Sequence, residues 1–375
     1  MESKEHRGLI ERIPFYVSHK YPIIREIKEL RWDRKVLYSE AIEQFDKGKP
    51  IHGSLSDYKK ALYKHRVSYR EYMYGYAYWK LDEKQRNTFI SQREMWCIYR
   101  KIIQPDVRKH LADKVLFLKS FKSFVHREWI NPVEVDFDSF LSFVNSHDCI
   151  AKPLLGDQGK GVFMVDTKDV EGYRKLYEYC KTNNYLIEEK IKACPEIEEF
   201  HPQSLNTIRV VTMSGKGKSE VLGALFRMGV NGSIVDNSHA GGLCTPIDIQ
   251  TGITMTDGMN LDGESYEYHP DSGIRIKGFC IPHWDDCLRV CSQASQVIPN
   301  NYITGWDICV MPDGQVELIE GNSAPDVDGG LQVPLKKGIK KRVQEIGKRL
   351  YGFDSLSLLP FWSRSYKYYG GFLSQ

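Results

Sequence analysis

The feature that most constrains the fold is a predicted β-hairpin that gathers polar side chains on one face near the C-terminal end. Two apolar stretches flank the turn Met311–Gly314, whose Pro-Asp-Gly sequence is a strong turn signal. Folding at this turn places Asp307 nearly opposite Glu320, because antiparallel partners face each other on one side of a sheet. Asn322 follows Glu320 by two residues and therefore projects from the same side. The chain must contain an antiparallel sheet with a polar centre.

Two carboxylates and one amide oxygen on a hairpin form a set of hard oxygen donors. Such a set suits Mg²⁺, which takes a few protein oxygens and completes its octahedron with water and phosphate. From the hairpin alone, an equally valid interpretation is that Asp307 and Glu320 are solvated residues on an exposed sheet face.

A glycine-rich loop in the middle of the chain is a candidate phosphate-binding loop. Lys152 ends a predicted strand, and Gly156, Gly159 and Gly161 follow it, so that backbone N–H groups can approach anionic oxygens. The lysine would neutralise a phosphate. The loop is not a Walker A motif, because Lys160 precedes a glycine rather than Ser or Thr. Taken alone, a flexible hairpin turn explains the glycines equally well.

The segment 185–191 is an apolar strand that ends in charge, Tyr-Leu-Ile-Glu-Glu-Lys-Ile. An extended linker of this kind can present one backbone N–H and one C=O to the edge of an adenine ring. The alternative is that Glu188 and Glu189 are solvated charges at a strand end.

The remaining pattern predicts an α+β fold. The first 110 residues have helical spacing, including the capping-box pattern Ser54–Asp57, and their tyrosine-rich stripe (Tyr72, Tyr74, Tyr76, Tyr78 and Trp79) is interpreted as core rather than as a sugar- or base-stacking surface. Beyond them, locally paired strands mix with helices. The predicted elements are a hairpin over 149–166, strands at 185–189, 207–213, 220–228, 302–311 and 315–320, and helices at 169–180, 286–297 and 337–350.

Composition narrows the class of protein. The chain has 375 residues, 41% of them hydrophobic and 27% charged, as in globular proteins. We expect a cytoplasmic protein, because the first residues lack the apolar core of a secretory signal and no stretch is apolar enough to span a membrane. The nine cysteines show no CxxC pair and are expected to be reduced thiols without structural metal.

The net charge of the chain is +3, but it is uneven: basic residues outnumber acidic ones in the first 110 residues, and acidic residues outnumber basic ones in the remainder. A basic front of this kind suits nucleic acid, an acidic partner or a membrane surface. We favour a solvated helical surface without a nucleic-acid partner, because acidic residues are interleaved with the basic ones.

Taken in order, these segments resemble the ATP-grasp superfamily. The series Asp113-Lys114, Lys152-Pro153 with its glycine loop, residues 186–191, Asp307 and Glu320-Gly-Asn322 is similar to that of D-alanine–D-alanine ligases and ribosomal-protein glutamate ligases over about 111–335. The sugar-transfer-associated ATP-grasp family, found beside polysaccharide genes, is closer still. The residues that carry this second resemblance are Ser204–Arg209, Val235–Asn237, Gly241-Gly242, Asp248, Thr251-Gly252, His269-Pro270, Gly273, Pro282–Trp284 and Gly305–Asp307.

The resemblance implies two α+β subdomains that clasp ATP behind a helical N-terminal segment. The expected division is a helical domain at 1–110, a small lid subdomain at 111–195, a central subdomain with the metal site at 196–350 and a tail at 351–375.

The resemblance also implies roles for individual residues. Lys114 and Lys152 would contact ATP phosphates and the adenine side of the cleft, while Glu188, Glu189 and Ile191 would form the adenine linker. Thr207 stands where glutamate ligases carry a ribose-binding Asp, and Asn237 matches the Asn of their Arg-Ser-Asn loop. Asp307, Glu320 and Asn322 would hold magnesium, with two ions expected. D-Alanine ligases place an Arg two residues before the first metal Asp; Gly305 stands there, and Arg209 and Arg227 would supply the positive charge instead.

The function implied is an ADP-forming carbon–nitrogen ligase that uses ATP and Mg²⁺. It would join a small-molecule carboxylate to an amine through an acyl phosphate, on an amino acid or sugar precursor of a glycan or polysaccharide. A kinase acting on a hydroxyl or amide keeps the same metal ligands and is favoured slightly by Gly305. A catalytically silent nucleotide-binding protein is a third interpretation, disfavoured because all three metal ligands are present.

Overall fold

Two antiparallel sheets organise the computed structural model, which describes residue 39 and residues 53–68, 71–72, 78–155, 159, 161–167, 169–327 and 329–358. The larger, central sheet has the strand order β11-β10-β5-β6-β7-β8-β9, and the smaller sheet has the order β1-β4-β2-β3. The strands are β1 Trp129–Ile130, β2 Cys149–Pro153, β3 Phe163–Met164, β4 Tyr185–Glu189, β5 Ile208–Gly215, β6 Lys218–Met228, β7 Leu243–Pro246, β8 Gly258–Met259, β9 Ser265–Tyr266, β10 Ile303–Val310 and β11 Val316–Asn322.

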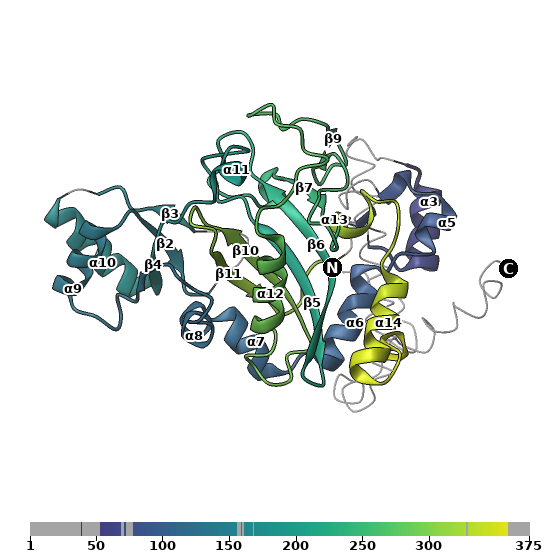
Figure 1. Ribbon diagram of the computed structural model, residues 1–375, viewed down its shortest axis with the longest axis horizontal. Coiled ribbons are helices and arrows are strands. Elements are labelled where there is room, and N and C mark those ends of the chain that lie inside the picture. The colour runs from purple at the N-terminus through teal and green to yellow at the C-terminus, as the bar shows by residue number, and fades with distance from the viewer. Residues whose placement is uncertain are drawn as a thin grey trace, which may run out of the picture.

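The described helices lie around these sheets (Figure 1). The α-helices are α3 Leu55–Lys60, α5 Glu83–Arg86, α6 Gln92–Ile102, α7 Pro105–Ala112, α8 Lys114–Ser120, α9 Phe137–Ser146, α10 Val170–Asn183, α11 Pro195–Glu198, α12 Trp284–Ala294, α13 Gly329–Gln332 and α14 Lys340–Tyr351. A π-helical turn spans Ala61–His65, and 3₁₀ turns span Tyr78–Lys80, Ser238–Ala240 and Ser355–Leu358.

Helices cover both faces of the central sheet. Successive residues of a strand point to opposite sides, and here both sides carry apolar side chains that need covering. Val210 belongs to the core formed with α7, α8 and α12, whereas Val211 belongs to the core formed with α6 and α14. Trp306 is fully buried on the α8 side, where Phe121 meets it edge-on at a ring-centroid distance of 5.3 Å. Asp307, the next residue along β10, therefore projects from the opposite face.

The small sheet forms a separate lobe with α9 and α10, at the left of Figure 1, which we call the lid. Its own apolar core contains Phe140, Ala151, Tyr177 and Ile187. Helix α8, although it falls within the expected lid range 111–195, contributes Phe117 and its neighbours to the core of the central sheet instead. The lid core therefore begins after α8, while the other expected boundaries stay a prediction.

The described part of the N-terminal region, from residue 53 onward, is helical, as expected. Ser54 caps α3 by accepting a hydrogen bond from the backbone N–H of Asp57 at 3.1 Å. Tyr72 and Tyr78 are buried, which confirms the core interpretation for these two tyrosines. Tyr74 and Tyr76 lie outside the described residues, as do most of residues 1–52 and the tail beyond 358.

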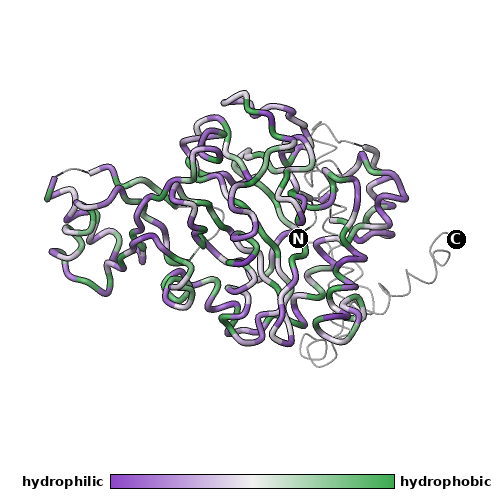
Figure 2. Tube along the Cα trace, in the orientation of Figure 1, coloured by the Kyte–Doolittle hydropathy of each residue, from purple (hydrophilic) through white to green (hydrophobic). Residues whose placement is uncertain are grey.

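The predicted hairpins and helices are present within a few residues of their expected bounds, but β1, β7, β8, β9, α8, α9, α11 and α13 were not predicted. Hydrophilic and hydrophobic segments are mixed along the whole coloured trace in Figure 2, and none of the helices in the described ranges is long and apolar enough to cross a membrane. The nine cysteines are free thiols.

Candidate active site

The hairpin β10–β11 brings Asp307 and Glu320 together in the register predicted from the sequence. Asp307 pairs with Glu320, and Gly305 pairs with Asn322. A register shift between Asp307 and Ile308 follows immediately, and such irregularities re-aim side chains next to functional sites. The Nδ2 of Asn322 donates to Oε1 of Glu320 at 3.2 Å.

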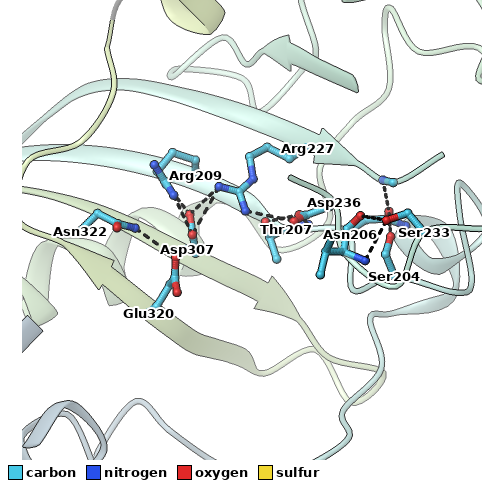
Figure 3. A network of polar contacts seen from close by, with 12 residues as sticks. Ser204, Asn206, Thr207, Arg209, Arg227, Ser233, Asp236, Asp307, Glu320 and Asn322 are labelled. Atoms are coloured by element: carbon cyan, nitrogen blue, oxygen red, sulfur yellow. Dashed lines mark hydrogen bonds and ion pairs between the residues drawn. The ribbon is translucent and has the colours of Figure 1, made fainter. Parts of the chain in front are cut away.

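Two arginines converge on Asp307 from neighbouring strands (Figure 3). Arg209, opposite Asp307 on β5, donates through Nε to Oδ1 and through Nη2 to Oδ2, the latter at 2.7 Å. Arg227, at the end of β6, places Nη1 3.4 Å from both oxygens. The side chain of Asp307 is only 2% exposed, so both guanidinium groups act on it with little screening by water.

The charges in this cluster shift the pKa values of the two carboxylates in opposite directions. Burial alone would raise the pKa of Asp307, but Arg209 and Arg227 outweigh burial and hold that pKa far below its usual range. Glu320 is exposed to solvent as a residue, but its carboxyl group lies within hydrogen-bonding reach of Asp307. Desolvation, followed by the negative charge of Asp307, raises the pKa of Glu320. Asp307 is therefore a fixed anion, whereas the raised pKa of Glu320 means that it takes up a proton more readily than an ordinary glutamate.

Asp236 extends the cluster away from the hairpin; the sequence analysis included it in the segment 235–237 but gave it no role of its own. Its Oδ1 accepts from Nη2 of Arg227 at 3.0 Å, and its Oδ2 accepts from the backbone N–H of Thr207 at 2.8 Å and from the Thr207 hydroxyl. Thr207, expected at a ribose position, thus uses its hydroxyl to hold Asp236. Asn237, the next residue, accepts from the backbone N–H groups of Ala240 and Gly242 and shapes the same loop.

Gly305 makes room for Arg209. A Cβ atom at position 305 would lie 2.7 Å from Cβ of Pro325 and 3.2 Å from Cδ of Arg209. The stem of Arg209 therefore passes over Gly305, and its guanidinium group reaches Asp307 from the neighbouring strand β5. Its role as a replacement for the arginine of D-alanine ligases stays a prediction.

A pocket lies between the lid and the linker that leaves it. Its walls come from β2, β3 and β4, from residues 190–193 and 202–205, and from Ile234 and Ile319. The expected residues Lys152, Glu188, Glu189 and Ile191 all line it, and Arg127 and Glu198 line it without having been predicted. Apolar side chains from β2 and β3 give this space the walls that a planar base requires.

Glu188 is not the solvated strand-end charge that was one alternative. It is buried, and its carboxylate accepts from Nζ of Lys152 at 2.6 Å and from Nε of Arg127 at 3.0 Å. Burial would raise the pKa of Glu188, but Arg127 and Lys152 reverse the effect and lower it to about 2.

The candidate phosphate loop is only partly described, because Gly156 and Lys160 lie outside the described residues. Gly159 and Gly161 adopt φ angles of +68° and +76°, which glycine tolerates best. A Cβ on Gly159 would lie 2.9 Å from Cγ1 of Val235, so this loop packs against the segment that carries Asp236. Lys114 begins α8, and its backbone N–H lies 3.5 Å from the Leu154 carbonyl, which places it near the end of β2.

The donor chemistry of the hairpin fits a magnesium ion, since Asp307, Glu320 and Asn322 all carry side-chain oxygens. In the described part of the chain, no group of three or more His, Cys, Asp or Glu side chains is arranged to hold a metal. The hairpin offers two carboxylates and one amide, a set that relies on phosphate oxygens to complete a coordination sphere.

A sequence profile matches most of the region just described. The profile of the family described as sugar-transfer associated ATP-grasp matches residues 134–348, which is more than half of the chain. No curated protein matches the chain.

Solved structures of ATP-grasp proteins are similar at low identity. PsnB, an ATP-grasp ligase complexed with minimal precursor, Mg and ADP, is 16% identical with a TM-score of 0.35, over 60% of this chain and 54% of that one. An L-amino acid ligase from Bacillus licheniformis is 10% identical with a TM-score of 0.36, over 62% and 48%. The N5-carboxyaminoimidazole ribonucleotide synthetase purK, in its ADP complex, is 8% identical with a TM-score of 0.38, over 58% and 46%. The chain spans about half the length of these proteins.

Proposed function

Because this chain belongs to the sugar-transfer associated ATP-grasp family, we propose that it is an ATP- and magnesium-dependent ligase that joins a carboxylate to an amine. The observation that carries the proposal is the Asp307–Glu320 pair on β10–β11, with two arginines from β5 and β6 directed at it. A metal-binding pair and a concentrated positive charge at one place suit phosphoryl transfer between two anions.

ATP would lie with its base in the pocket beside the lid and its phosphates directed toward the hairpin. The linker at 190–191 follows β4 directly and lines the pocket, and its backbone would meet the edge of adenine there. Lys152 points into the same pocket from β2 and would bind a phosphate, together with the backbone of Gly159 and Gly161. Lys114 and Asn237 would contribute at the phosphate side, and Thr207 would act through Asp236.

Asp307, Glu320 and Asn322 would hold the magnesium, for which we expect two ions. When bound, magnesium would neutralise the negative charge that develops on the phosphoryl group during transfer. The protein's own part is electrostatic. Arg209 and Arg227 would turn from Asp307 toward the substrate anions, since a metal supplies Asp307 with a new positive partner.

The reaction would run in two steps. A carboxylate oxygen of the substrate attacks the γ-phosphorus of ATP, and ADP leaves. The amine then attacks the acyl carbon, and phosphate leaves as the amide forms. Arg209 and Arg227 would stabilise the acyl phosphate oxygens throughout. From the family description, we propose an amino acid or sugar precursor in glycan or polysaccharide biosynthesis as the substrate class.

The alternative is a kinase that phosphorylates a hydroxyl or amide and stops there. Its support was the missing arginine at position 305. The passage of Arg209 over Gly305 weakens this argument, because Arg209 brings a positive charge to the hairpin from β5, and this charge would hold an acyl phosphate.

Hydroxylamine trapping distinguishes the two functions. The protein is incubated with ATP, Mg²⁺, and pools of amino acids and sugar acids, with and without hydroxylamine. A ligase forms a hydroxamate from its carboxylate alone and releases ADP and phosphate, because an acyl phosphate is a reactive mixed anhydride. A stable phosphorylated product with no hydroxamate, and no amide from any amine in the pool, would replace the ligase by the kinase.

A further inference from the structure

A buried cluster of four charged side chains joins the lid to the central sheet. It consists of Arg127, Lys152, Glu188 and Glu317, whose side chains are 3%, 17%, 2% and 0% exposed. We propose that Arg127 is a positioning residue for the nucleotide: it fixes the lid against β11 and keeps Glu188 paired when Lys152 turns to the phosphates of ATP. The inference rests on the ATP site proposed above and adds to it a residue that no sequence motif indicated.

One guanidinium group serves both sheets. The Nε of Arg127 donates to Glu188 of β4 at 3.0 Å, while Nη1 contacts Glu317 of β11 and donates to the Leu318 carbonyl at 2.8 Å. Its Nη2 donates to the Ile319 carbonyl at 3.1 Å. Lysine lacks a planar fork of five N–H donors and has no equivalent set of bonds. Arg127 therefore attaches the lid to the strand segment directly before Glu320.

Lys152 is the member of the cluster that would move when ATP binds. Its Nζ lies 2.6 Å from Oε2 of Glu188, the same oxygen that accepts from Nε of Arg127. It is the most exposed of the four side chains and lines the pocket. An incoming phosphate attracts Lys152, and Glu188 loses one cation but keeps the other. Without Arg127, the departure of Lys152 would leave the buried carboxylate of Glu188 without a cation. Because this is costly, Glu188 would retain Lys152.

Glu317 balances the second charge of the cluster. It accepts from the backbone N–H of His126 at 2.6 Å as well as pairing with Arg127. The segment 126–127 is therefore bound to β11 through one carboxylate by both main chain and side chain. A Gln at position 317 would keep the shape and the acceptor for His126 while removing the charge that holds Arg127.

The test compares ATP with adenosine, because only ATP presents phosphates to Lys152. Binding of each to the full chain is measured by titration calorimetry for the wild type, Arg127→Lys and Glu317→Gln. Arg349→Lys is the matched control. Arg349 forms an exposed ion pair with Glu220, with Nη2 and Oε2 2.6 Å apart, and neither residue lines the pocket. We expect Arg127→Lys to weaken ATP binding about tenfold more than adenosine binding, because a charge-assisted phosphate contact is lost. Glu317→Gln should shift the ratio in the same direction, and Arg349→Lys should not shift it.

Equal losses for ATP and adenosine, or no loss for either, in Arg127→Lys would assign Arg127 a structural role alone and overturn the inference. If Arg127→Lys does not fold, the ratio in Glu317→Gln decides in the same way. A wild-type protein that binds no ATP removes the proposed function, and this inference with it. A wild type that binds ATP, with unchanged ratios in both variants, removes only the inference.

Discussion

Replacing Glu188 by Gln should alter the acid stability of the protein by an amount set by its buried ion pairs. The pKa of Glu188 falls from 4.5 to about 2 in the folded chain. That change corresponds to about 3 kcal/mol of stabilisation of the charged, folded form. The shift is a depression, so the contribution is fully present above pH 4.5 and is lost as the pH falls toward 2.

At pH 3.5 the wild type should have lost roughly 1.5 kcal/mol through this one carboxylate, relative to pH 7. Glu188→Gln has no such group to titrate, so its unfolding free energy should start lower at pH 7 and approach that of the wild type as the pH falls. Urea unfolding followed by circular dichroism between pH 7 and 3.5 measures both curves. Glu220→Gln, at an exposed pair with Arg349, is the control and should converge much less. Parallel curves for the wild type and Glu188→Gln would refute the reasoning.

Three further substitutions probe the two halves of the site. Gly305→Ala places a Cβ 2.7 Å from Cβ of Pro325 and should destabilise the fold by about 1–3 kcal/mol; an unchanged melting temperature would show that Pro325 yields freely. ATP at a hundredfold above its Kd should stabilise the wild type by about 2.7 kcal/mol, seen as a higher melting temperature. Lys152→Ala should remove most of this increase, and a full increase in the variant would exclude Lys152 from phosphate binding. Arg209→Gln leaves Asp307 with only Arg227 at 3.4 Å and should cost about 3 kcal/mol, seen as a lower melting temperature in the absence of nucleotide, whereas equal melting would mean that Arg227 alone satisfies Asp307.

The hairpin site was predictable because its signals are local. A turn between two apolar strands fixes the register, and side chains two apart share a face, so the placement of Asp307 opposite Glu320, with Asn322 two residues on, follows from spacing alone. Their role as metal ligands stays a prediction. The same holds for the strand at 185–189, which the structure gives with the expected bounds.

The residues that were missed act over long separations or in irregular chain. Arg127 meets partners 61 and 190 residues away, and nothing in its own neighbourhood indicates them. Asp236 lies in a loop, where no periodicity shows which way a side chain points. The strands β8 and β9 have two residues each, too few for alternation to be recognised. The buried state of Glu188 likewise depends on Arg127 and could not be derived from its own charged neighbours.

The most direct test of the account is the binding of Mg·ATP to the hairpin carboxylates. Calorimetric titration of ATP, with and without Mg²⁺, is compared for the wild type and Glu320→Ala, whose fold is checked by circular dichroism. We predict that the wild type binds ATP more tightly with Mg²⁺ than without it, and that Glu320→Ala loses this dependence, together with ATP turnover, while remaining folded. A folded Glu320→Ala protein that binds Mg·ATP and turns it over as the wild type does would contradict the assignment of the site.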